Sequence, residues 1–533
     1  MKRKWRVPLA LMATAAIVGA AGCEATAAPE GTDDPAVVRT EGGLLRGSVR
    51  EGLREFQAVP YAAPPVGALR WQNPRPAAPW QGERDATRPP PACAQGPGVA
   101  LRGPAAEDCL YLNVTAPAGG ADRKPVVLWI HGGAFQTGTG ASMDAEPMAR
   151  RGDVVVVTIN YRLGMFGFFG LPGLPGSGTF GLSDQQSAMA WVRRNIAAFH
   201  GDSSNVTIAG QSSGAMSNCA HLTSPTAAGL FDKVVMQSGS CAVSWLTNFG
   251  ERHKPEGRVF LPLDEVAETG RRTATDLGCV GAESTIVDCL RGLPVDKLRP
   301  VLNTFSDPAF GTPVLPSDPS AALHAGRFAP VPVLSGNTRD EATFETVYYD
   351  YPDPITEQDY DAVLSETFGA RRAAVETEYP RSAYGSAALA FAAIVTDRKW
   401  ACPQEHTARD LAARTTVYEY EFADPNPPSI LPPPLGMPLR AYHSSDVLSL
   451  FDLVGVSATF TPEQQRLSDL MIDYWTGFAR TGDPNGPDRP KWPAFRADAN
   501  PPHTQALAPG RDGVARVNLA ETHHCAFWSG AGQ

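Results

Sequence analysis

Gly210-Gln211-Ser212-Ser213-Gly214 lies between a short β-branched strand at 205–209 and a stretch at 215–222 that is typical of a helix. A serine between two glycines on a strand-to-helix turn is the signature of a nucleophile elbow. The backbone turns sharply there and passes close to the following helix, and only glycine tolerates both the crowding and the unusual dihedral angles. The pattern is weak by itself, but its flanks favour an elbow over an ordinary structural turn. We therefore predict that Ser212 is an exposed nucleophile.

Strand and helix signals alternate on both sides of this elbow. Continuous apolar runs of strand length are expected to be buried on both faces of a sheet. The predicted strands are 125–130, 153–159, 205–209, 233–236 and 331–334, and further helices are predicted at 184–199 and 462–480. This alternation predicts an α/β fold with a mostly parallel sheet. Region 245–330 is interpreted as an inserted helical segment, and 429–438 as a proline-rich loop.

The overall composition excludes some classes of function. The net charge is −10, so no basic face is available to meet phosphates, and we expect no nucleic-acid partner. Beyond the first residues, no apolar run is long enough to cross a bilayer. Hydrophobic residues make up 43% of the chain and charged residues 19%, so we expect an ordinary globular protein.

The first residues predict export. Residues 1–6 are basic, and 7–21 form an apolar stretch that is short for a membrane span and suitable for a signal peptide. The stretch ends in Ala20-Ala21-Gly22-Cys23, and small residues before a cysteine resemble a bacterial lipoprotein cleavage site. Ala20 stands where such sites usually have leucine. We predict lipidation of Cys23, with plain secretion as the alternative.

This interpretation divides the chain into three parts. We predict a signal peptide at 1–23, a flexible tether at 24–35 and one domain at 36–533. The protein is then a bacterial cell-surface lipoprotein or a secreted protein, and it meets a membrane only through its lipid anchor.

The cysteine count agrees with export. The chain has nine cysteines, and eight remain when Cys23 is set aside. An even number of cysteines in an exported chain suggests disulfides. None of the eight has the C-x₂-C spacing of a zinc site. We predict no metal site and no cofactor.

Several longer motifs, in their order along the chain, resemble the type-B carboxylesterase family, which includes carboxylesterases, cholinesterases and bacterial para-nitrobenzyl esterases. The motifs are 56–67, Glu107-Asp108-Cys109-Leu110-Tyr111-Leu112-Asn113-Val114, His131-Gly132-Gly133-Ala134-Phe135, 205–214 and Gln237-Ser238-Gly239-Ser240. The resemblance implies the α/β-hydrolase fold, with a large, mostly parallel central sheet, helices on both faces and inserted helical segments. It also implies a serine hydrolase that cleaves small-molecule carboxylic esters.

Hydrolysis by Ser212 needs a base within hydrogen-bond reach, because a serine hydroxyl is inert at its free pKa. The chain has ten histidines. The segment 441–451 resembles the catalytic histidine loop of the family, which implies that His443 is the base. His131 belongs to the oxyanion loop and is expected to be structural.

The acid that orients the base follows a strand in this fold. Asp340 and Glu341 both follow the predicted strand 331–334, and chemistry alone leaves both open. The resemblance assigns Glu341 as the acid and gives Asp340 a structural role, although Ala342 stands where the family usually has glycine. The resulting order of serine, acid and histidine is the one expected for this fold.

The resemblance also implies oxyanion donors and disulfides. The oxyanion donors are the backbone N–H groups of Gly132, Gly133 and Ser213. The implied disulfides are Cys93–Cys109, Cys279–Cys289 and Cys402–Cys525, and Cys219 and Cys241 then remain as a fourth pair.

The elbow departs from the G-E-S-A-G pattern that is usual in the family. Gln211 replaces the glutamate, which makes the pocket less negative, and Ser213 replaces the alanine. Cholinesterases also carry an aromatic residue in the loop closed by the first disulfide, whereas 94–108 here has no Trp, Tyr or Phe. We hypothesise that the substrate is a neutral ester rather than a choline ester.

Two alternative functions stay open at this point. One is a non-catalytic binding or adhesion protein on the same fold, although such members lose triad residues that are all present here. The other is an amidase or carbamate hydrolase that uses the same triad.

Overall fold

The computed structural model describes residues 34–96, 104–119, 123–347, 349, 354–431 and 435–530. The described residues from Pro35 onward belong to one compact unit. The predicted signal peptide, the lipidation site Cys23 and nearly all of the tether lie outside these residues, so they stay predictions. Across the described ranges, we find no helix with the length and apolar character that crossing a membrane requires.

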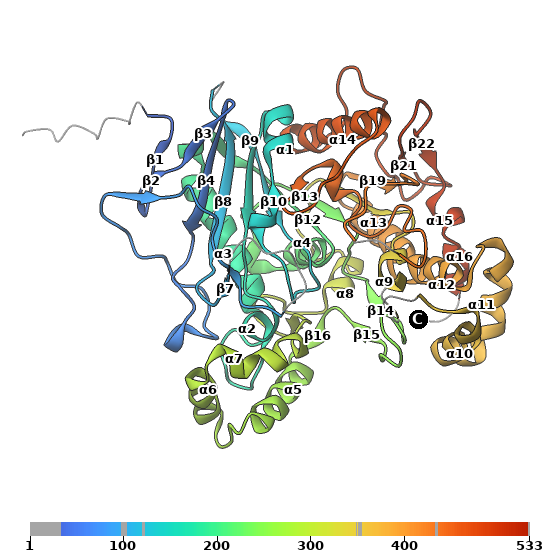
Figure 1. Cartoon of the computed structure of the whole chain (residues 1–533), viewed down its shortest axis with the longest axis horizontal. Coiled ribbons are helices and arrows are strands. Elements are labelled where there is room, and N and C mark those ends of the chain that lie inside the picture. Colours follow the sequence, from blue (N-terminus) through green and yellow to red (C-terminus); the bar gives the residue numbers. More distant parts are fainter. Residues whose placement is uncertain are drawn as a thin grey trace, which may run out of the picture. The chain divides into compact units, whose positions relative to one another are not determined.

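A central sheet of 11 strands organises the described part of the chain (Figure 1). Its strands are β3 (Ser48–Arg50), β4 (Leu53–Pro60), β8 (Tyr111–Pro117), β9 (Lys124–Ile130), β11 (Val155–Ile159), β12 (Gly201–Gln211), β13 (Lys233–Gln237), β18 (Val333–Thr338), β19 (Val417–Phe422), β21 (Thr504–Leu507) and β22 (Val514–Val517). Their order across the sheet is β22-β21-β19-β18-β13-β12-β9-β11-β8-β4-β3.

The strands from β11 to β21 in this order pair in parallel, and the strands at both edges pair antiparallel. The predicted mostly parallel sheet is therefore confirmed for its centre. Parallel strands need crossover connections, which are helical here, and helices cover both faces of such a sheet. The carboxyl ends of β9, β12 and β18 consequently meet at one edge.

The helices have the following bounds. They are α1 (Glu146–Gly152), α2 (Gly164–Phe168), α3 (Phe180–Asn195), α4 (Ser213–Thr223), α5 (Leu263–Asp276), α6 (Glu283–Gly292), α7 (Val295–Leu298), α8 (Pro319–His324), α9 (Thr343–Val347), α10 (Glu357–Phe368), α11 (Arg372–Glu378), α12 (Ala387–Val395), α13 (Cys402–Ala412), α14 (Pro462–Thr481), α15 (Leu519–Thr522) and α16 (Cys525–Gly530). A π-helix (Thr396–Ala401) joins α12 to α13.

Two apolar cores lie on opposite faces of the sheet. Along β9, Val126 and Leu128 point into one core, whereas Val127 and Trp129 point into the other. Helices α3 and α4 complete the first core, and α1 and α14 complete the second. This alternation explains why β9 reads as a continuous apolar run, since both of its faces are covered.

Helix α14 illustrates how local sequence sets an element. Thr461 and Gln464 form a capping box at its start, Pro462 occupies the first turn, and Gly482 ends it in the left-handed conformation. The helix was expected over 462–480, and the structure extends it by one residue.

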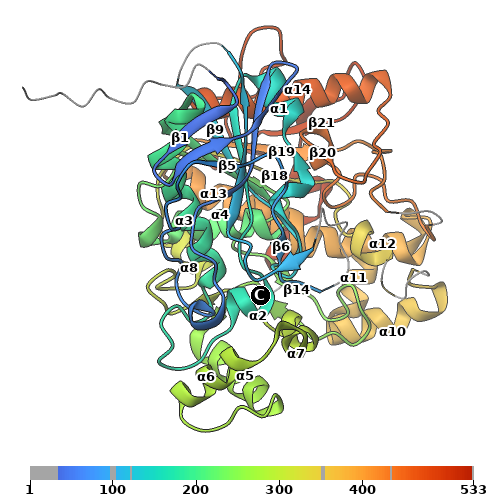
Figure 2. The same cartoon turned by 60° about the vertical axis from the view of Figure 1, so that its left-hand side comes forward.

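The remaining strands form small sheets. These are β1 (Val37–Thr40) with β2 (Gly43–Arg46) and β5 (Glu83–Asp85), β6 (Ala92–Cys93) with β7 (Ala105–Ala106), β10 (Met143–Asp144) with β20 (Asp452–Leu453), β14 (Ser244–Trp245) with β15 (Gly257–Arg258), and β16 (Leu261–Pro262) with β17 (Ala309–Phe310). Region 245–330, expected to be helical, thus holds α5 to α8 together with short strands. Helices α5, α6 and α7 lie together in both views (Figure 1 and Figure 2).

Four disulfides join the cysteine pairs that the sequence analysis expects, Cys93–Cys109, Cys219–Cys241, Cys279–Cys289 and Cys402–Cys525. Cys402–Cys525 spans 123 residues and ties α16 to the start of α13. On the loop-entropy model, a bridge of this span stabilises the fold by about 4–5 kcal/mol. Cys219–Cys241 ties α4, the helix that follows the elbow, to the segment after β13.

Candidate active site

Ser212 stands between β12 and α4 with φ 56° and ψ −126°. A non-glycine residue in this region costs about 1–3 kcal/mol and persists only when its surroundings hold it. Here the Ser212 N–H donates to the Gln237 carbonyl at 2.9 Å, and its own carbonyl accepts from the Met216 N–H at 2.9 Å. A serine whose strained backbone is held at the end of a parallel strand has the geometry of a nucleophile elbow.

The two elbow glycines are required by close backbone contacts. A Cβ on Gly214 would lie 2.0 Å from the Ile130 carbonyl oxygen, and one on Gly210 would lie 2.7 Å from the same atom. Helix α4 therefore starts against the end of β9 at a distance that no side chain permits. The glycine pattern that marked the elbow in the sequence has this steric cause.

The loop after β9 packs directly on the elbow. A Cβ on Gly132 would lie 2.8 Å from the Gln211 carbonyl oxygen and 3.0 Å from the Ser212 Cβ. Gly133 has φ 115°, which favours glycine. Within the described residues, the N–H groups of Gly132 and Gly133 donate no hydrogen bond to the protein. Ser213 is the first residue of α4, where N–H groups lack helical acceptors.

The His131 side chain packs against this loop. Its ring stacks on Tyr161 with centroids 4.5 Å apart, and its Nδ1 lies 2.8 Å from the Gly132 carbonyl oxygen. Burial lowers the pKa of His131 to about 4, so the ring is neutral. These contacts are those of a structural residue, as expected.

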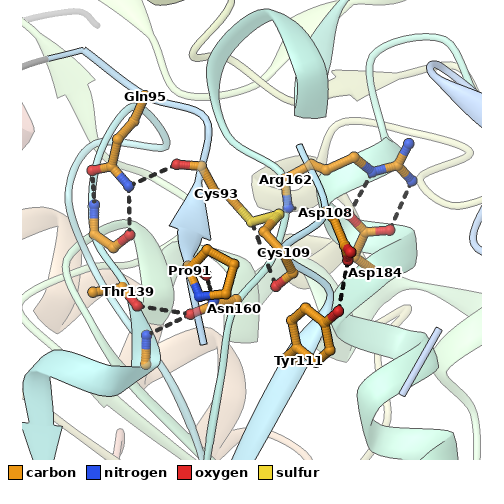
Figure 3. Close-up of a disulfide and its surroundings, with 12 residues drawn as sticks. Pro91, Cys93, Gln95, Asp108, Cys109, Tyr111, Thr139, Asn160, Arg162 and Asp184 are labelled. Atoms are coloured by element: carbon orange, nitrogen blue, oxygen red, sulfur yellow. Dashed lines mark hydrogen bonds and ion pairs between the residues drawn. A yellow bond between two sulfur atoms is a disulfide. The ribbon is translucent and has the colours of Figure 1, made fainter. Parts of the chain in front are cut away.

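The segment around the first disulfide holds the far end of the same loop (Figure 3). The Gln95 side chain exchanges two hydrogen bonds of 2.9 Å with the backbone of Gly138 and donates a third to the Cys93 carbonyl. Asn160 accepts from Thr139 and from the Gly140 N–H, and it donates to the Pro91 carbonyl. The glycine-rich loop is therefore fixed at both ends.

Glu341 and His443 lie in direct contact. The His443 Nδ1 is 2.5 Å from Glu341 Oε2, and the His443 backbone N–H donates to the Glu341 carbonyl at 3.1 Å. The second carboxylate oxygen of Glu341 accepts from the Thr338 N–H at the end of β18. Glu341 is fully buried and His443 is 6% exposed. Burial opposes protonation of the imidazole, but the Glu341 carboxylate outweighs it, and the pKa of His443 lies above its ordinary value.

Asp340, the other acid candidate, points elsewhere. Its backbone N–H donates to the Ala441 carbonyl, its carboxylate accepts from the Ala441 N–H at 3.4 Å, and Arg440 lies 3.7 Å away. Asp340 thus clamps the acid turn to the histidine loop, whereas Glu341 reaches the imidazole.

A buried polar cluster anchors the histidine loop, and sequence reasoning did not find it. Asp446 accepts hydrogen bonds of 2.8 Å from Gln237 and from the Tyr420 hydroxyl. Trp475 in α14 donates to Gln237 at 2.9 Å. Gln237 also supplies the carbonyl that holds the elbow. The serine turn and the histidine loop are therefore both held by Gln237, at the end of β13. Asp446 and Gln237 both lie in family motifs, which was the signal available in the sequence.

Ser212 and His443 are not bonded to each other in this structure. The Gln211 amide nitrogen lies 3.1 Å from His443 Nε2, the atom that would accept the serine proton. Nδ1–H donates to Glu341, so the free Nε2 accepts from the amide. Across the described ranges, the Ser212 hydroxyl has no hydrogen-bond partner. Catalytic hydrogen bonds commonly tighten only when substrate binds.

A small cavity of about 130 Å³ lies beside the acid turn and is lined by Asp340, Thr343 and Arg440, among other residues. A cavity of about 530 Å³ between the 71–75 loop, the 172–175 loop and α6 contains none of the residues discussed above. In the parts of the chain that are described, no group of three or more His, Cys, Asp or Glu residues is arranged to hold a metal ion.

Comparisons with known proteins point to one family. A model of the carboxylesterase family matches residues 34–528. The para-nitrobenzyl esterase of Bacillus subtilis (strain 168) is 33% identical over 477 residues, which covers 87% of this chain and 93% of that protein. The acylcarnitine hydrolase of Mus musculus is 31% identical over 537 residues, with 90% and 91% covered.

Solved structures give the same result. A PNB esterase superposes with a TM-score of 0.74 at 30% identity, and a thermophilic PNB esterase with 0.76 at 30% identity. In both cases the superposition covers 93% of this chain and 100% of the other.

Proposed function

This chain belongs to the carboxylesterase family and is a carboxylic ester hydrolase, and from that premise we propose that it works through a Ser212–His443–Glu341 triad and an acyl-serine intermediate. The contact that carries the proposal is the 2.5 Å bond from His443 Nδ1 to the buried Glu341 carboxylate, beside a strained serine. That bond leaves Nε2 unprotonated and directed at the elbow, as a general base requires.

The reaction begins when substrate displaces the Gln211 amide from His443 Nε2. Ser212 Oγ attacks the ester carbonyl as its proton passes to Nε2, and Glu341 stabilises the imidazolium that forms. The alcohol leaves with that proton, and an acyl-serine remains. Water then attacks the acyl group by the same route in reverse, and the carboxylic acid is released.

The oxyanion of each tetrahedral intermediate is held by the N–H groups of Gly132, Gly133 and Ser213. The two glycine N–H groups have no acceptor in the described protein, so they are available without cost. Removing one such donor typically slows a reaction of this type by about 10²–10³-fold. Gln95 and Asn160 contribute indirectly because they fix the loop that carries the glycines.

A fluorophosphonate probe tests this mechanism directly. It should form one covalent adduct, found on the peptide that contains Ser212, in the wild-type protein and not in Ser212→Ala. His443→Asn should retain the fold, as judged by its melting temperature, and react slowly or not at all. Unlabelled wild-type protein would contradict the triad and would favour a non-catalytic binding protein.

The proposed substrate is a neutral ester. Gln211 supplies no negative charge at the elbow, and Trp400, the indole ring beside the imidazole, already belongs to an aromatic cage that encloses a cation of the chain itself. Trp245, Phe249 and Trp400 lie 3.3–4.2 Å from the Lys399 ammonium, measured to the ring centroids. A quaternary ammonium group therefore finds no free aromatic cage among these rings.

A substrate panel tests this preference. We expect kcat/KM for p-nitrophenyl esters to exceed that for thiocholine esters of the same acyl group by about 10-fold or more. The matching p-nitroanilides and p-nitrophenyl carbamates in the same panel separate an esterase from an amidase or a carbamate hydrolase. Equal or faster turnover of the thiocholine esters would overturn the neutral-ester assignment.

Export and lipidation at Cys23 complete the proposal. The predicted cleavage site at 20–23 supports a lipid anchor at the cell surface. Cys23→Ser should move the activity from the membrane fraction to the soluble fraction of cells that process lipoproteins. An unchanged distribution would contradict lipidation.

A further inference from the structure

Lys399 is a fully buried cation beside the triad, and the proposed mechanism does not use it. It lies in the π-helix that joins α12 to α13, and its side chain is 1% exposed. A π-helix is rare and often marks a functional site. Burying an ammonium group costs several kcal/mol unless other groups compensate for the lost water.

Three aromatic rings and one carboxylate provide that compensation. The Lys399 Nζ lies 3.3 Å from the centroid of the Phe249 ring, 3.8 Å from that of Trp400 and 4.2 Å from that of Trp245. Glu345 Oε1 in α9 lies 3.4 Å from the same nitrogen. The ammonium is therefore held in one place by cation–π contacts and an ion pair.

Trp400 connects this cage to His443. Its indole ring lies 4.6 Å from the imidazole ring, centroid to centroid, with the two planes at 31°. The same indole forms one wall of the cage. The lysine cation and the imidazole thus contact one aromatic side chain, in a region where neither is exposed to screening water.

The charged groups that face the imidazole can be named from each element around it. Glu341 and Glu345 act from the acid turn and α9, Lys399 acts from the π-helix, and Asp446 acts from the histidine loop. The carboxylates favour the imidazolium, and Lys399 opposes it. Lys254 faces Lys399 in turn and opposes its charge.

We propose that Lys399 is a positioning residue whose caged ammonium opposes protonation of His443 and so keeps the base available at lower pH. The inference rests on the proposed role of His443. Burial lowers the pKa of Lys399 to about 7, so the ammonium is present on the acid side of neutrality. That is the range in which the Glu341 and Glu345 carboxylates draw a proton onto the imidazole.

The test compares pH profiles of four proteins: wild type, Lys399→Met, Glu345→Gln and the double variant. The readouts are the rate of fluorophosphonate labelling of Ser212 and kcat/KM for p-nitrophenyl acetate between pH 5 and 9. A melting temperature measured at each pH restricts the comparison to folded protein. Lys124→Met is the matched control, because Lys124 is 4% exposed and pairs with Asp153 at the far end of β9.

Lys399→Met should move the acid limb to higher pH by about 0.5–1 unit, which is a roughly 3- to 10-fold loss of rate at a fixed pH on that limb. Glu345→Gln should move it to lower pH, and the double variant should return it near the wild-type position. Lys124→Met should leave it unchanged. A limb that stays in place or moves to lower pH in Lys399→Met would overturn the proposal.

Glu345→Gln carries the test if Lys399→Met does not fold, and a limb that stays in place or moves to higher pH in that variant is equally decisive against the proposal. The two levels of inference remain separable. If wild-type protein is not labelled at Ser212 at any pH, the proposed triad is wrong. If every variant is labelled with coincident profiles, only the role of Lys399 is wrong.

Discussion

Two buried histidines of this chain are bonded to carboxylates, and they are bonded differently. His443 has one carboxylate, Glu341 on Nδ1, and a neutral amide on Nε2. His523 has a carboxylate on each nitrogen, with Asp397 at 2.6 Å from Nδ1 and Glu421 at 2.8 Å from Nε2. Both rings lie within the protein, at 6% and 3% exposure.

The difference determines what each ring can do. Burial opposes the charge of His523, but its two carboxylates outweigh burial and raise its pKa to about 10. It is therefore a permanent cation at neutral pH, and it links β19, the π-helix and the segment before Cys525. His443 keeps one nitrogen without a charged partner, so it can accept a proton and return it. A histidine base needs one orienting carboxylate, and a second on the other nitrogen turns the ring into a structural ion.

Replacing each histidine by asparagine should give the largest effects, and it should distinguish the proposed base, His443, from the structural cation, His523. His443→Asn should lower kcat/KM by about 10⁴-fold or more, because triad members act as a unit, and should leave the melting temperature nearly unchanged. His523→Asn should lower the free energy of unfolding by about 3–5 kcal/mol, because two buried carboxylates lose their shared cation. Its folded fraction should retain nearly wild-type kcat. Ester hydrolysis and differential scanning calorimetry measure the two effects.

Ser212→Ala serves as the control for the first effect, since it should lose as much activity as His443→Asn at unchanged stability. The contrast between the two rings is wrong if His523→Asn abolishes activity while its melting temperature stays at the wild-type value.

The stability that His523 provides should depend on pH. A folded-state pKa raised from 6.5 to about 10 means that the native protein holds a proton that the unfolded chain releases. The contribution is therefore fully present below about pH 6.5 and is lost as pH rises toward about 10. The difference in unfolding free energy between wild type and His523→Asn should be largest at pH 6 and should shrink by a few kcal/mol by pH 9.5.

His524→Asn is the matched control for this profile. His524 is the next residue, pairs with Glu378 at 2.6 Å and has a side chain 31% exposed. Its replacement should change stability by about 1 kcal/mol or less, because exposed pairs contribute little. A difference for His523→Asn that stays constant from pH 6 to 9.5 would show that its imidazole is not charged in the native state.

The sequence allowed prediction of those parts of the site that local rules constrain. The elbow was predictable because Gly210 and Gly214 meet the Ile130 carbonyl, which no other residue permits. Motifs that resemble a family pointed to His443 and Glu341, and the structure places these two side chains in direct contact. The order of serine, acid and histidine followed from the fold.

Contacts between distant segments were not predictable. Nothing near His523 distinguishes it from the other histidines, because its partners Asp397 and Glu421 lie 126 and 102 residues away. Strand β19 was also missed, since alternate glutamates suggest an exposed face. Those glutamates are buried, and Glu421 is paired with His523 and Arg339. The predicted strand at 331–334 begins instead at Val333, because Pro332 has no N–H to donate to a ladder.

The smallest expected effect is a shift of the pH profile when His443, like His523, is given a carboxylate at its second ring nitrogen. Gln211→Glu places a carboxylate at the nitrogen that now accepts from a neutral amide, 3.1 Å away. The pKa of His443 should rise, because a nearby anion favours the imidazolium. The acid limb of kcat/KM should then move to higher pH by about 0.5 unit, with activity above pH 9 unchanged.

The family pattern carries glutamate at this position, so the enzyme should stay active after the exchange. Gln211→Met is the control that removes the amide without adding charge. Because the amide donates to the neutral ring, its loss alone should also move the acid limb to higher pH, but by less than the added carboxylate does. The two variants together test why the pKa of His443 differs from that of His523. They distinguish the missing charge of residue 211 from its hydrogen bond as the cause. An upward shift of equal size in both variants would mean that the lost amide contact, and not the added carboxylate, sets the pKa of His443.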